Sequence, residues 1–233
     1  MSILAISVSY DAALELRFFL GSVLAILPTQ QDLKWVILEN PSPSADTTFM
    51  DGVSHPQLEF QRLPENIGKG NAVNAYLRSH LNRENLPDVL VSVDADILFS
   101  PTEFAALVQA TRDLPNVGFL SMRYRQNNCQ PERNLWLPAR THRGQSGAKY
   151  KIKHPFLCNV AGGVIALPGR VLAEDLNFEL YPKADGQTYY PDDAFLYDTL
   201  KKRGRLLGYL QGTAAWHLRS GPNRDLPTWT PSV

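Results

Sequence analysis

The sequence has few cysteines, no long hydrophobic run and no excess of charge of either sign. Cys129 and Cys158 are the only cysteines among 233 residues, and neither belongs to a Cys-x-x-Cys metal or redox pattern. No apolar run approaches the ~20 residues of a membrane-spanning helix. Lysine and arginine together number 23, as do aspartate and glutamate. No overall electric field therefore favours nucleic acid or an anionic membrane as a partner.

Targeting signals and internal repeats are missing as well. Residues 1–10 contain no basic stretch and are too short for the core of a signal peptide. We therefore expect a reduced, cytoplasmic protein, and peripheral attachment to the inner membrane face stays open. The length, with 44% hydrophobic residues, suits one large globular domain or two small ones.

Two common glycine patterns for phosphate binding are absent. The chain has no Gly-x-x-x-x-Gly-Lys-Ser/Thr sequence, and no dinucleotide-binding fingerprint follows its first predicted strand. Gly68-Lys69-Gly70-Asn71 instead opens a predicted helix, where backbone N–H groups and Lys69 would suit an anion. A glycine-rich turn with a surface lysine is the plain alternative.

Predicted strands alternate with predicted helices along most of the chain. The strands are expected at 3–9, 35–38, 58–63, 88–93, 117–122 and 206–210, with a strand pair or bulged strand at 156–167. The helices are expected at 12–27, 72–81, 102–114, 169–176 and 191–203. This alternation predicts an α/β fold, a single domain with a mostly parallel central sheet flanked by helices.

Two carboxylates stand where the strand at 88–93 is predicted to end. If the chain stayed extended, Asp94 and Asp96 would point to the same face. Two like charges at close range need a cation or strong donors to offset them. Mg²⁺ and Mn²⁺ take such carboxylates and share them with substrate phosphates. The alternative is a polar turn, followed by a helix that Ser100-Pro101 caps.

Two further loops bring polar groups to the same predicted sheet edge. Tyr10-Asp11 follows the first strand with an aromatic ring and an acceptor, and Glu39-Asn40 follows the second with a carboxylate and an amide. An ionised carboxylate only accepts hydrogen bonds, so Glu39 would suit the imide N–H of uracil. Each loop alone is compatible with ordinary surface structure, but ligands of open α/β sheets bind beyond the carboxyl ends of the strands.

The second half of the chain adds acids, a histidine and a basic segment. Asp192-Asp193 opens a predicted helix, where a carboxylate would suit a general base, although acids are favoured in any first helical turn. His217 follows the last predicted strand, and a lone histidine is more often structural. The segment 123–153 carries Arg123, Arg125, Arg133, Arg140, Arg143, Lys149, Lys151 and Lys153 against Glu132 alone. It is either a solvated loop or a site for an anionic partner: a phosphorylated lipid, an acidic glycan or, less favoured, nucleic acid.

In their order along the chain, these pieces resemble the family 2 glycosyltransferases and the wider GT-A fold. The resemblance runs from Ile3 to about Leu218. It is carried by Val8-Ser9-Tyr10-Asp11, Leu38-Glu39-Asn40-Pro41-Ser42, Asn66 to Ala72, Asp94-Ala95-Asp96 as the Asp-x-Asp motif, Ala161-Gly162-Gly163, Asp192-Asp193 and Trp216-His217. Two positions depart from the family pattern: Glu39 replaces an aspartate, and Asp192 replaces a glutamate.

The resemblance implies a transferase that moves a sugar from a nucleotide-diphosphate sugar, in the first place a UDP-sugar, to an acceptor hydroxyl of a glycan or a lipid phosphate. The donor would be bound by Ser9, Tyr10, Asp11, Glu39, Asn40, Lys69, Asn71, Asp94, Ala95, Gly162 and Gly163. Asp96, Asp94 and His217 would hold Mn²⁺ or Mg²⁺. Asp193 would be the catalytic base, with Asp192 as the alternative, and the transfer would be inverting.

The resemblance also divides the chain. Residues 1–122 would form the nucleotide-sugar half, 123–218 the acceptor-binding and catalytic half, and 219–233 an irregular tail, all within one continuous domain. Two other functions stay open. A sugar-phosphate nucleotidyltransferase would need a glycine-rich loop where Ser9-Tyr10-Asp11 stands. A non-catalytic nucleotide- or carbohydrate-binding protein would need no paired carboxylates.

Overall fold

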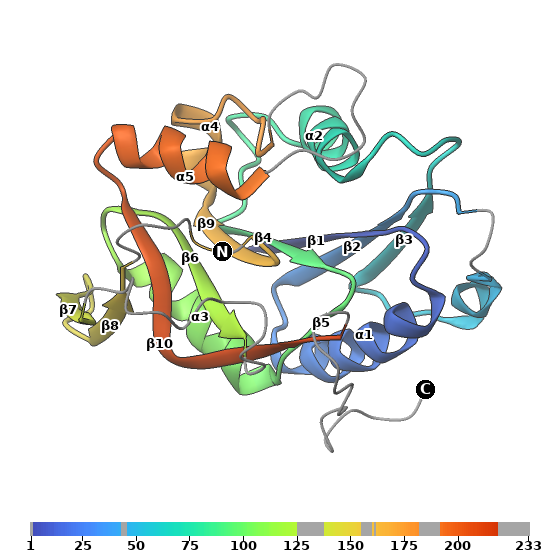
Figure 1. Ribbon diagram of the computed structural model, residues 1–233, viewed down its shortest axis with the longest axis horizontal. Coiled ribbons are helices and arrows are strands. Elements are labelled where there is room, and N and C mark those ends of the chain that lie inside the picture. Colours follow the sequence, from blue (N-terminus) through green and yellow to red (C-terminus); the bar gives the residue numbers. More distant parts are fainter. Residues whose placement is uncertain are drawn as a thin grey trace.

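The computed structural model describes residues 2–42, 46–124, 138–154, 160, 162–181 and 192–218, with only the backbone of Asp192 and Asp193 (Figure 1). The strands are β1 (Ile3–Ser9), β2 (Leu33–Glu39), β3 (Leu58–Arg62), β4 (Val89–Asp94), β5 (Ile97–Leu98), β6 (Val117–Tyr124), β7 (Arg140–Arg143), β8 (Lys149–Lys153), β9 (Val164–Pro168) and β10 (Leu206–His217). The helices are α1 (Ala13–Ile26), α2 (Lys69–His80), α3 (Pro101–Asp113), α4 (Gly169–Glu174) and α5 (Asp192–Lys202), with short 3-10 turns η1 (Leu27–Thr29) and η2 (Thr48–Gly52).

The strands of the described residues form one mixed sheet in the order β3-β2-β1-β4-β9-β6-β10-β8-β7. β3, β2, β1 and β4 are parallel, as are β6 and β10. β9 lies antiparallel between β4 and β6, and β8 and β7 extend the sheet antiparallel beyond β10. The short β5 pairs with the end of β10. The predicted α/β domain, a single sheet flanked by helices, is confirmed.

The sheet buries both faces because its strands are apolar on both. In β4, Val91 and Val93 pack with α1 and α3, whereas Leu90 packs with α2, α4 and α5. Figure 1 shows these two helical layers on opposite sides of the sheet. Such double cover is what near-continuous apolar strands require, and it leaves the strand ends and the sheet edges to carry polar chemistry.

Several elements differ from the prediction. α2 begins at Lys69, earlier than the predicted start. β10 continues to His217, because a bulge at 210–213 lets the strand resume pairing with β6. The antiparallel hairpin β7–β8 lies inside the basic segment, where no element was predicted. Among the residues that the structure describes, no helix is long and apolar enough to cross a membrane.

Candidate functional site

A cavity of about 520 Å³ opens at the carboxyl ends of β1 and β4. It is lined by Val8, Tyr10, Ala12, Asn40, Asn66, Gly68, Lys69, Asp94, Ala95 and Asp96. The parallel register explains the convergence, because Val8 lies opposite Asp94 and the loops that follow both strands leave the sheet together. The structure thus brings the predicted residues Tyr10, Asn40, Lys69, Asp94, Ala95 and Asp96 to one cavity.

Lys69 and Asp94 form an ion pair in this cavity. Lys69 Nζ lies 2.7 Å from Asp94 Oδ1 and 4.9 Å from the centre of the Tyr181 ring. Lys69 is placed by Gly68, whose φ of 77° starts α2 in a conformation that residues with a side chain rarely adopt. The strand end is fixed as well, since the Asp94 N–H donates to the Gly163 carbonyl at 2.9 Å.

Asp96 and His217 meet although 121 positions separate them. The chain does not stay extended after Asp94: Ala95 and Asp96 form a turn. β5 then pairs with the end of β10, with Ile97 opposite His217. As a result, His217 Nε2 lies 3.2 Å from Asp96 Oδ2, and the Leu218 N–H donates to the Asp96 carbonyl at 2.8 Å.

Asp96 and His217 suit a divalent metal as two of its ligands. A carboxylate oxygen and an imidazole nitrogen are donors that Mn²⁺ accepts, and such a metal commonly completes its shell with substrate phosphates. The predicted third ligand, Asp94, is held by Lys69. Within the described residues, no group of three or more His, Cys, Asp or Glu side chains is placed to hold a metal. Among the described residues, Asp96 and His217 are therefore the pair whose donors could serve such a site.

Tyr124 supports His217, and sequence reasoning missed it. The two rings stack with centres 5.2 Å apart. The Tyr124 hydroxyl also occupies the space beside Gly163, where an added Cβ would lie 2.0 Å from it. Its position along the chain could have indicated Tyr124, because it is the last residue of β6 and lies opposite Ala215 of β10, at the same sheet edge. The predicted strand stopped at Met122.

Tyr181 is a second residue that the sequence did not indicate. It is buried, and its hydroxyl shares a hydrogen bond with Ser92 Oγ at 2.8 Å. The side-chain amide of Asn74 donates to the Tyr181 carbonyl at 2.7 Å and accepts from its N–H at 3.2 Å. The ring beneath Lys69 is thus fixed to α2 and β4 across more than 80 positions of sequence, which no local pattern reveals.

Ser9, Asp11 and Asn71, three of the predicted donor residues, shape the cavity without being among its lining residues, and the lining residue Asn40 is fixed in the same way. Asn71 Nδ2 donates to the Ile67 carbonyl at 3.0 Å, and Asn40 Oδ1 accepts from the Ile67 N–H at 3.2 Å. Ser9 is buried, and its carbonyl accepts from the Asn40 N–H at 2.9 Å. Asp11 has a positive φ of 48° and accepts from Ser42 Oγ at 3.1 Å. These contacts fix the loops from which the cavity is built.

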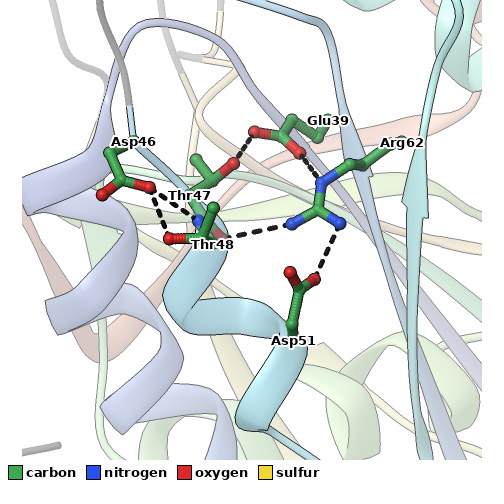
Figure 2. A network of polar contacts seen from close by, with 6 residues as sticks. All are labelled: Glu39, Asp46, Thr47, Thr48, Asp51 and Arg62. Carbon is green, nitrogen blue, oxygen red and sulfur yellow. Dashed lines mark hydrogen bonds and ion pairs between the residues drawn. The ribbon is translucent and has the colours of Figure 1, made fainter.

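Glu39 belongs to a separate polar network beside the cavity (Figure 2). It is buried, accepts a hydrogen bond from Thr47 Oγ1 and pairs with Arg62 Nε at 3.0 Å. Arg62 also pairs with Asp51 at 2.7 Å, and this ion pair raises its pKa. Hydrogen bonds from Thr48 hold the pKa of Asp46 below its ordinary value. The Glu39 carboxylate thus ties the loop 46–52 to β3 and is not among the lining residues.

The structure describes only some of the remaining predicted site residues. Asp192 and Asp193 begin α5, but their side chains lie outside the described residues. Gly162 and Gly163 precede β9, and Gly163 contacts the site through Asp94 and Tyr124. Arg125, Cys129 and Arg133 of the basic segment lie outside the described residues, as does Cys158, which follows that segment.

No family model matches the chain, and neither does any curated protein. Solved structures do. A mannosyltransferase from Pyrobaculum calidifontis, in complex with GDP-Man and Mn²⁺, aligns with 95% of this chain and 57% of its own at 17% identity and a TM-score of 0.64. S. aureus TarS 1–349, in complex with UDP-GlcNAc, aligns with 96% of this chain and 60% of its own at 13% identity and a TM-score of 0.64.

A third structure is glucosyl-3-phosphoglycerate synthase from Mycobacterium tuberculosis, in complex with Mn²⁺, UDP and phosphoglyceric acid. It aligns with 95% of this chain and 72% of its own at 16% identity and a TM-score of 0.61. At these identities the likeness shows the fold, which is the GT-A fold of these glycosyltransferases. The chain spans 57% of the mannosyltransferase and 60% of the TarS fragment.

Proposed function

We propose that this protein is a glycosyltransferase that uses a nucleotide-diphosphate sugar, in the first place a UDP-sugar, together with Mn²⁺ or Mg²⁺. The observation that carries the proposal is the approach of Asp96 and His217 to 3.2 Å at the edge of a cavity that also contains Lys69 and Asp94. Three solved proteins of this fold support it, because they are complexes with GDP-Man, UDP-GlcNAc or UDP, two of them with Mn²⁺.

The charged and aromatic side chains at this cavity each have a task in this proposal. Asp96 and His217 hold the metal, which when bound offsets the charge that develops on the leaving diphosphate. Lys69 releases Asp94 and turns to the diphosphate, where an ammonium group binds as a point charge. Tyr10, with 47% of its surface exposed, offers its ring to the nucleotide base. Asp94 would then be available to accept a hydrogen bond from a ribose hydroxyl or to add its charge to the metal site.

The acceptor side of the proposal rests on the sequence resemblance. Asp193, with Asp192 as the alternative, takes the proton from the acceptor hydroxyl as it attacks, and in-line attack inverts the anomeric centre. Both residues begin α5. Ionised carboxylates suit this task because they accept the proton without a further partner.

The test measures nucleoside diphosphate released from a panel of UDP-, GDP- and dTDP-sugars, with Mn²⁺, with Mg²⁺ and with EDTA. We expect metal-dependent release from one donor, and faster release once an acceptor is supplied. Pyrophosphate release from a nucleoside triphosphate and a sugar phosphate would instead identify a nucleotidyltransferase. Saturable binding of a donor without release of diphosphate under any metal condition would identify a non-catalytic binding protein. Either result contradicts the proposal.

A further inference from the structure

The hairpin β7–β8 is attached to the rest of the sheet over a short length. Figure 1 shows it at the end of the sheet opposite β3, beside β10. In the described part of the chain, β8 pairs with β10 at two positions, Ile152 and Lys153. At the turn, Asp113 of α3 accepts from the Ser146 N–H at 2.7 Å. The hairpin therefore relies on side-chain contacts for much of its attachment.

Two histidines make a further contact of this kind. His142 lies in β7 and His154 follows β8, and the Nε2 atoms of the two rings are 3.3 Å apart. The ring centres are 5.4 Å apart, and the ring planes are inclined at 64°. The two imidazoles therefore meet at their nitrogen edges and do not stack. Both residues are partly buried.

The separation of these two nitrogens fits a shared metal ion better than a direct hydrogen bond. An N–H donor and its acceptor oxygen are most often about 2.9–3.0 Å apart. Zinc binds histidine nitrogen at about 2.0–2.1 Å with tetrahedral angles, which places two ligand nitrogens about 3.3–3.4 Å from each other. The observed separation of 3.3 Å agrees with the second arrangement.

His154 is held in the tautomer that a metal requires. Its Nδ1 lies 3.0 Å from the Leu207 carbonyl oxygen. A carbonyl only accepts hydrogen bonds, so Nδ1 carries the proton and Nε2 keeps its lone pair toward His142. Metal-binding histidines usually donate their other N–H in this way, which fixes the orientation of the ring. Because Leu207 belongs to β10, the His154 ring also links the hairpin to the sheet.

Both imidazoles are kept neutral, which is the form that binds metal. Burial lowers the pKa of His142 and of His154, and the charge of Arg140 adds to this effect. Arg140 would also repel a divalent cation. Its residue is exposed, however, so that solvent and salt screen its charge.

We propose that His142 and His154 form a zinc site that ties β7 to β10. Imidazole suits Zn²⁺, whereas the oxygens of carboxylates and water suit Mg²⁺ and Mn²⁺. Among the described residues, no group of three or more His, Cys, Asp or Glu side chains is placed to hold a metal. The two histidines are thus two of the four ligands, and water completes the tetrahedron. Neither histidine lines the donor cavity, so the zinc site is independent of the proposed function.

The experiment titrates the full chain, without a histidine tag, with Zn²⁺ by isothermal calorimetry. The buffer contains millimolar Mg²⁺ to occupy oxygen sites, and its pH lies above the ordinary histidine pKa of about 6.5. We compare the wild type with H142Q/H154Q. The control H55Q/H80Q removes the same number of imidazoles elsewhere, and H217Q removes the histidine of the donor cavity.

We expect saturable Zn²⁺ binding that H142Q/H154Q weakens at least tenfold. Disturbing only a partner of a metal ligand already costs about 10–100-fold in affinity. The control and H217Q should retain the hairpin site within twofold. Zn²⁺ should also raise the thermal midpoint of the wild type relative to EDTA, because it binds the folded hairpin. H142Q/H154Q should lose this shift.

Far-UV circular dichroism in EDTA verifies that the variants fold. His142→Gln alone leaves the bond between His154 and Leu207 in place. It replaces the double variant if that protein is unfolded, and the same loss of zinc affinity is expected.

Three results would overturn the proposal. If the wild type shows no saturable Zn²⁺ binding, the two histidines share a plain hydrogen bond. Equal affinity in the wild type and H142Q/H154Q would place the zinc elsewhere. Loss of binding in H217Q alone would assign the zinc to the donor cavity. None of these results depends on donor turnover, so they are distinct from a failure of the proposed function.

Discussion

At the scale of single residues, Asp96 has two separate attachments. Its carbonyl accepts from Leu218, which fixes the backbone, and its carboxylate meets His217. Asp96→Asn keeps the shape of the side chain and removes the charge that a metal needs. We expect metal-dependent release of nucleoside diphosphate to fall by more than about 100-fold, since a metal Lewis acid supplies several kcal/mol.

The control for this variant is Asp198→Asn, which changes the same charge at an exposed position of α5. Both variants should unfold at the wild-type temperature. Near-normal turnover of Asp96→Asn in metal-replete buffer would show that this carboxylate does not hold the metal.

Gly163 is a second residue whose substitution should have a clear effect on the site. Its Cβ, if present, would collide with the Tyr124 hydroxyl and approach Ile97 at 3.2 Å. Gly163→Ala should therefore displace the ring that supports His217 and cost about 1–3 kcal/mol of stability through overpacking. The measurements are thermal unfolding and the Mn²⁺ affinity of the protein. Tyr124→Phe in the same chain removes the colliding oxygen and should restore part of both. If the double variant is no better than Gly163→Ala, the hydroxyl is not the obstacle.

The residues found from the sequence and those missed differ in how they reach the site. Tyr10, Asn40 and Asp94 come at or just after the ends of predicted strands. Because these strands were predicted to be parallel, the sequence already put the three residues at one edge of the sheet. Tyr124 lies beyond the predicted end of its strand, and Tyr181 is drawn in by Asn74 from 107 positions away. Contacts of that range depend on tertiary packing, which one sequence does not display.

At the scale of elements, the loop 46–52 is fixed to β2 and β3 by Glu39 and Arg62. If Glu39 acts by holding this loop, Glu39→Gln and Arg62→Gln should weaken donor binding by similar factors. The double variant should then add little, because both changes break the same contact. The measurement is the dissociation constant of UDP and of GDP for all four proteins. A change of preference between the two nucleotides in Glu39→Gln alone would show instead that the carboxylate reads the base.

The hairpin β7–β8 should make stability depend on pH. Nε2 of His142 lies 3.3 Å from Nε2 of His154, and His154 Nδ1 bonds to the Leu207 carbonyl. Burial lowers the pKa of both histidines, and the nearby Arg140 adds to this effect. The unfolded chain therefore binds protons at a higher pH than the folded one. The stability due to the neutral rings is complete above about pH 6.5, the ordinary histidine value, and is lost as the pH falls through the folded pKa values.

We therefore expect the thermal midpoint to fall between pH 7 and pH 5, and His142→Gln/His154→Gln to flatten this dependence. His80→Gln, on α2, serves as the control and should retain the wild-type slope. An unchanged slope in the double variant would assign the pH dependence to other groups.

The elements that the sequence predicted best are those with strong periodicity and clear ends. α3 begins at Pro101 with the capping box of Ser100 and Glu103, and it was found within a residue at each end. β7 was missed because it reads Arg-Thr-His-Arg, without the apolar alternation of a half-buried strand. β8 reads Lys-Tyr-Lys-Ile-Lys, and its alternation of Tyr150 and Ile152 with lysines was a strand signal that the prediction overlooked. β10 was cut short because the bulge interrupts its pattern at Gly212.

At the scale of the whole molecule, β9 joins the two halves of the sheet. It comes from the second half of the chain, yet it lies between β4 and β6 of the first. A fragment of residues 1–122 would leave both neighbours with unpaired edges, which favour aggregation. We expect this fragment to be insoluble, with sedimentation of the expressed protein as the measurement. A soluble monomer that binds nucleotide would show that the nucleotide half folds alone.

The ion pair between Lys69 and Asp94 has a consequence for what the donor cavity admits. In the resting protein, these opposite charges already satisfy each other. A ligand that separates Lys69 from Asp94 has to supply a new partner of opposite charge for each side chain. A divalent cation alone provides no partner for the lysine, and a diphosphate alone provides no partner for the aspartate. On the proposed function, a dication and a diphosphate that arrive together supply both, so the cavity should admit the metal–diphosphate complex and discriminate against either part alone.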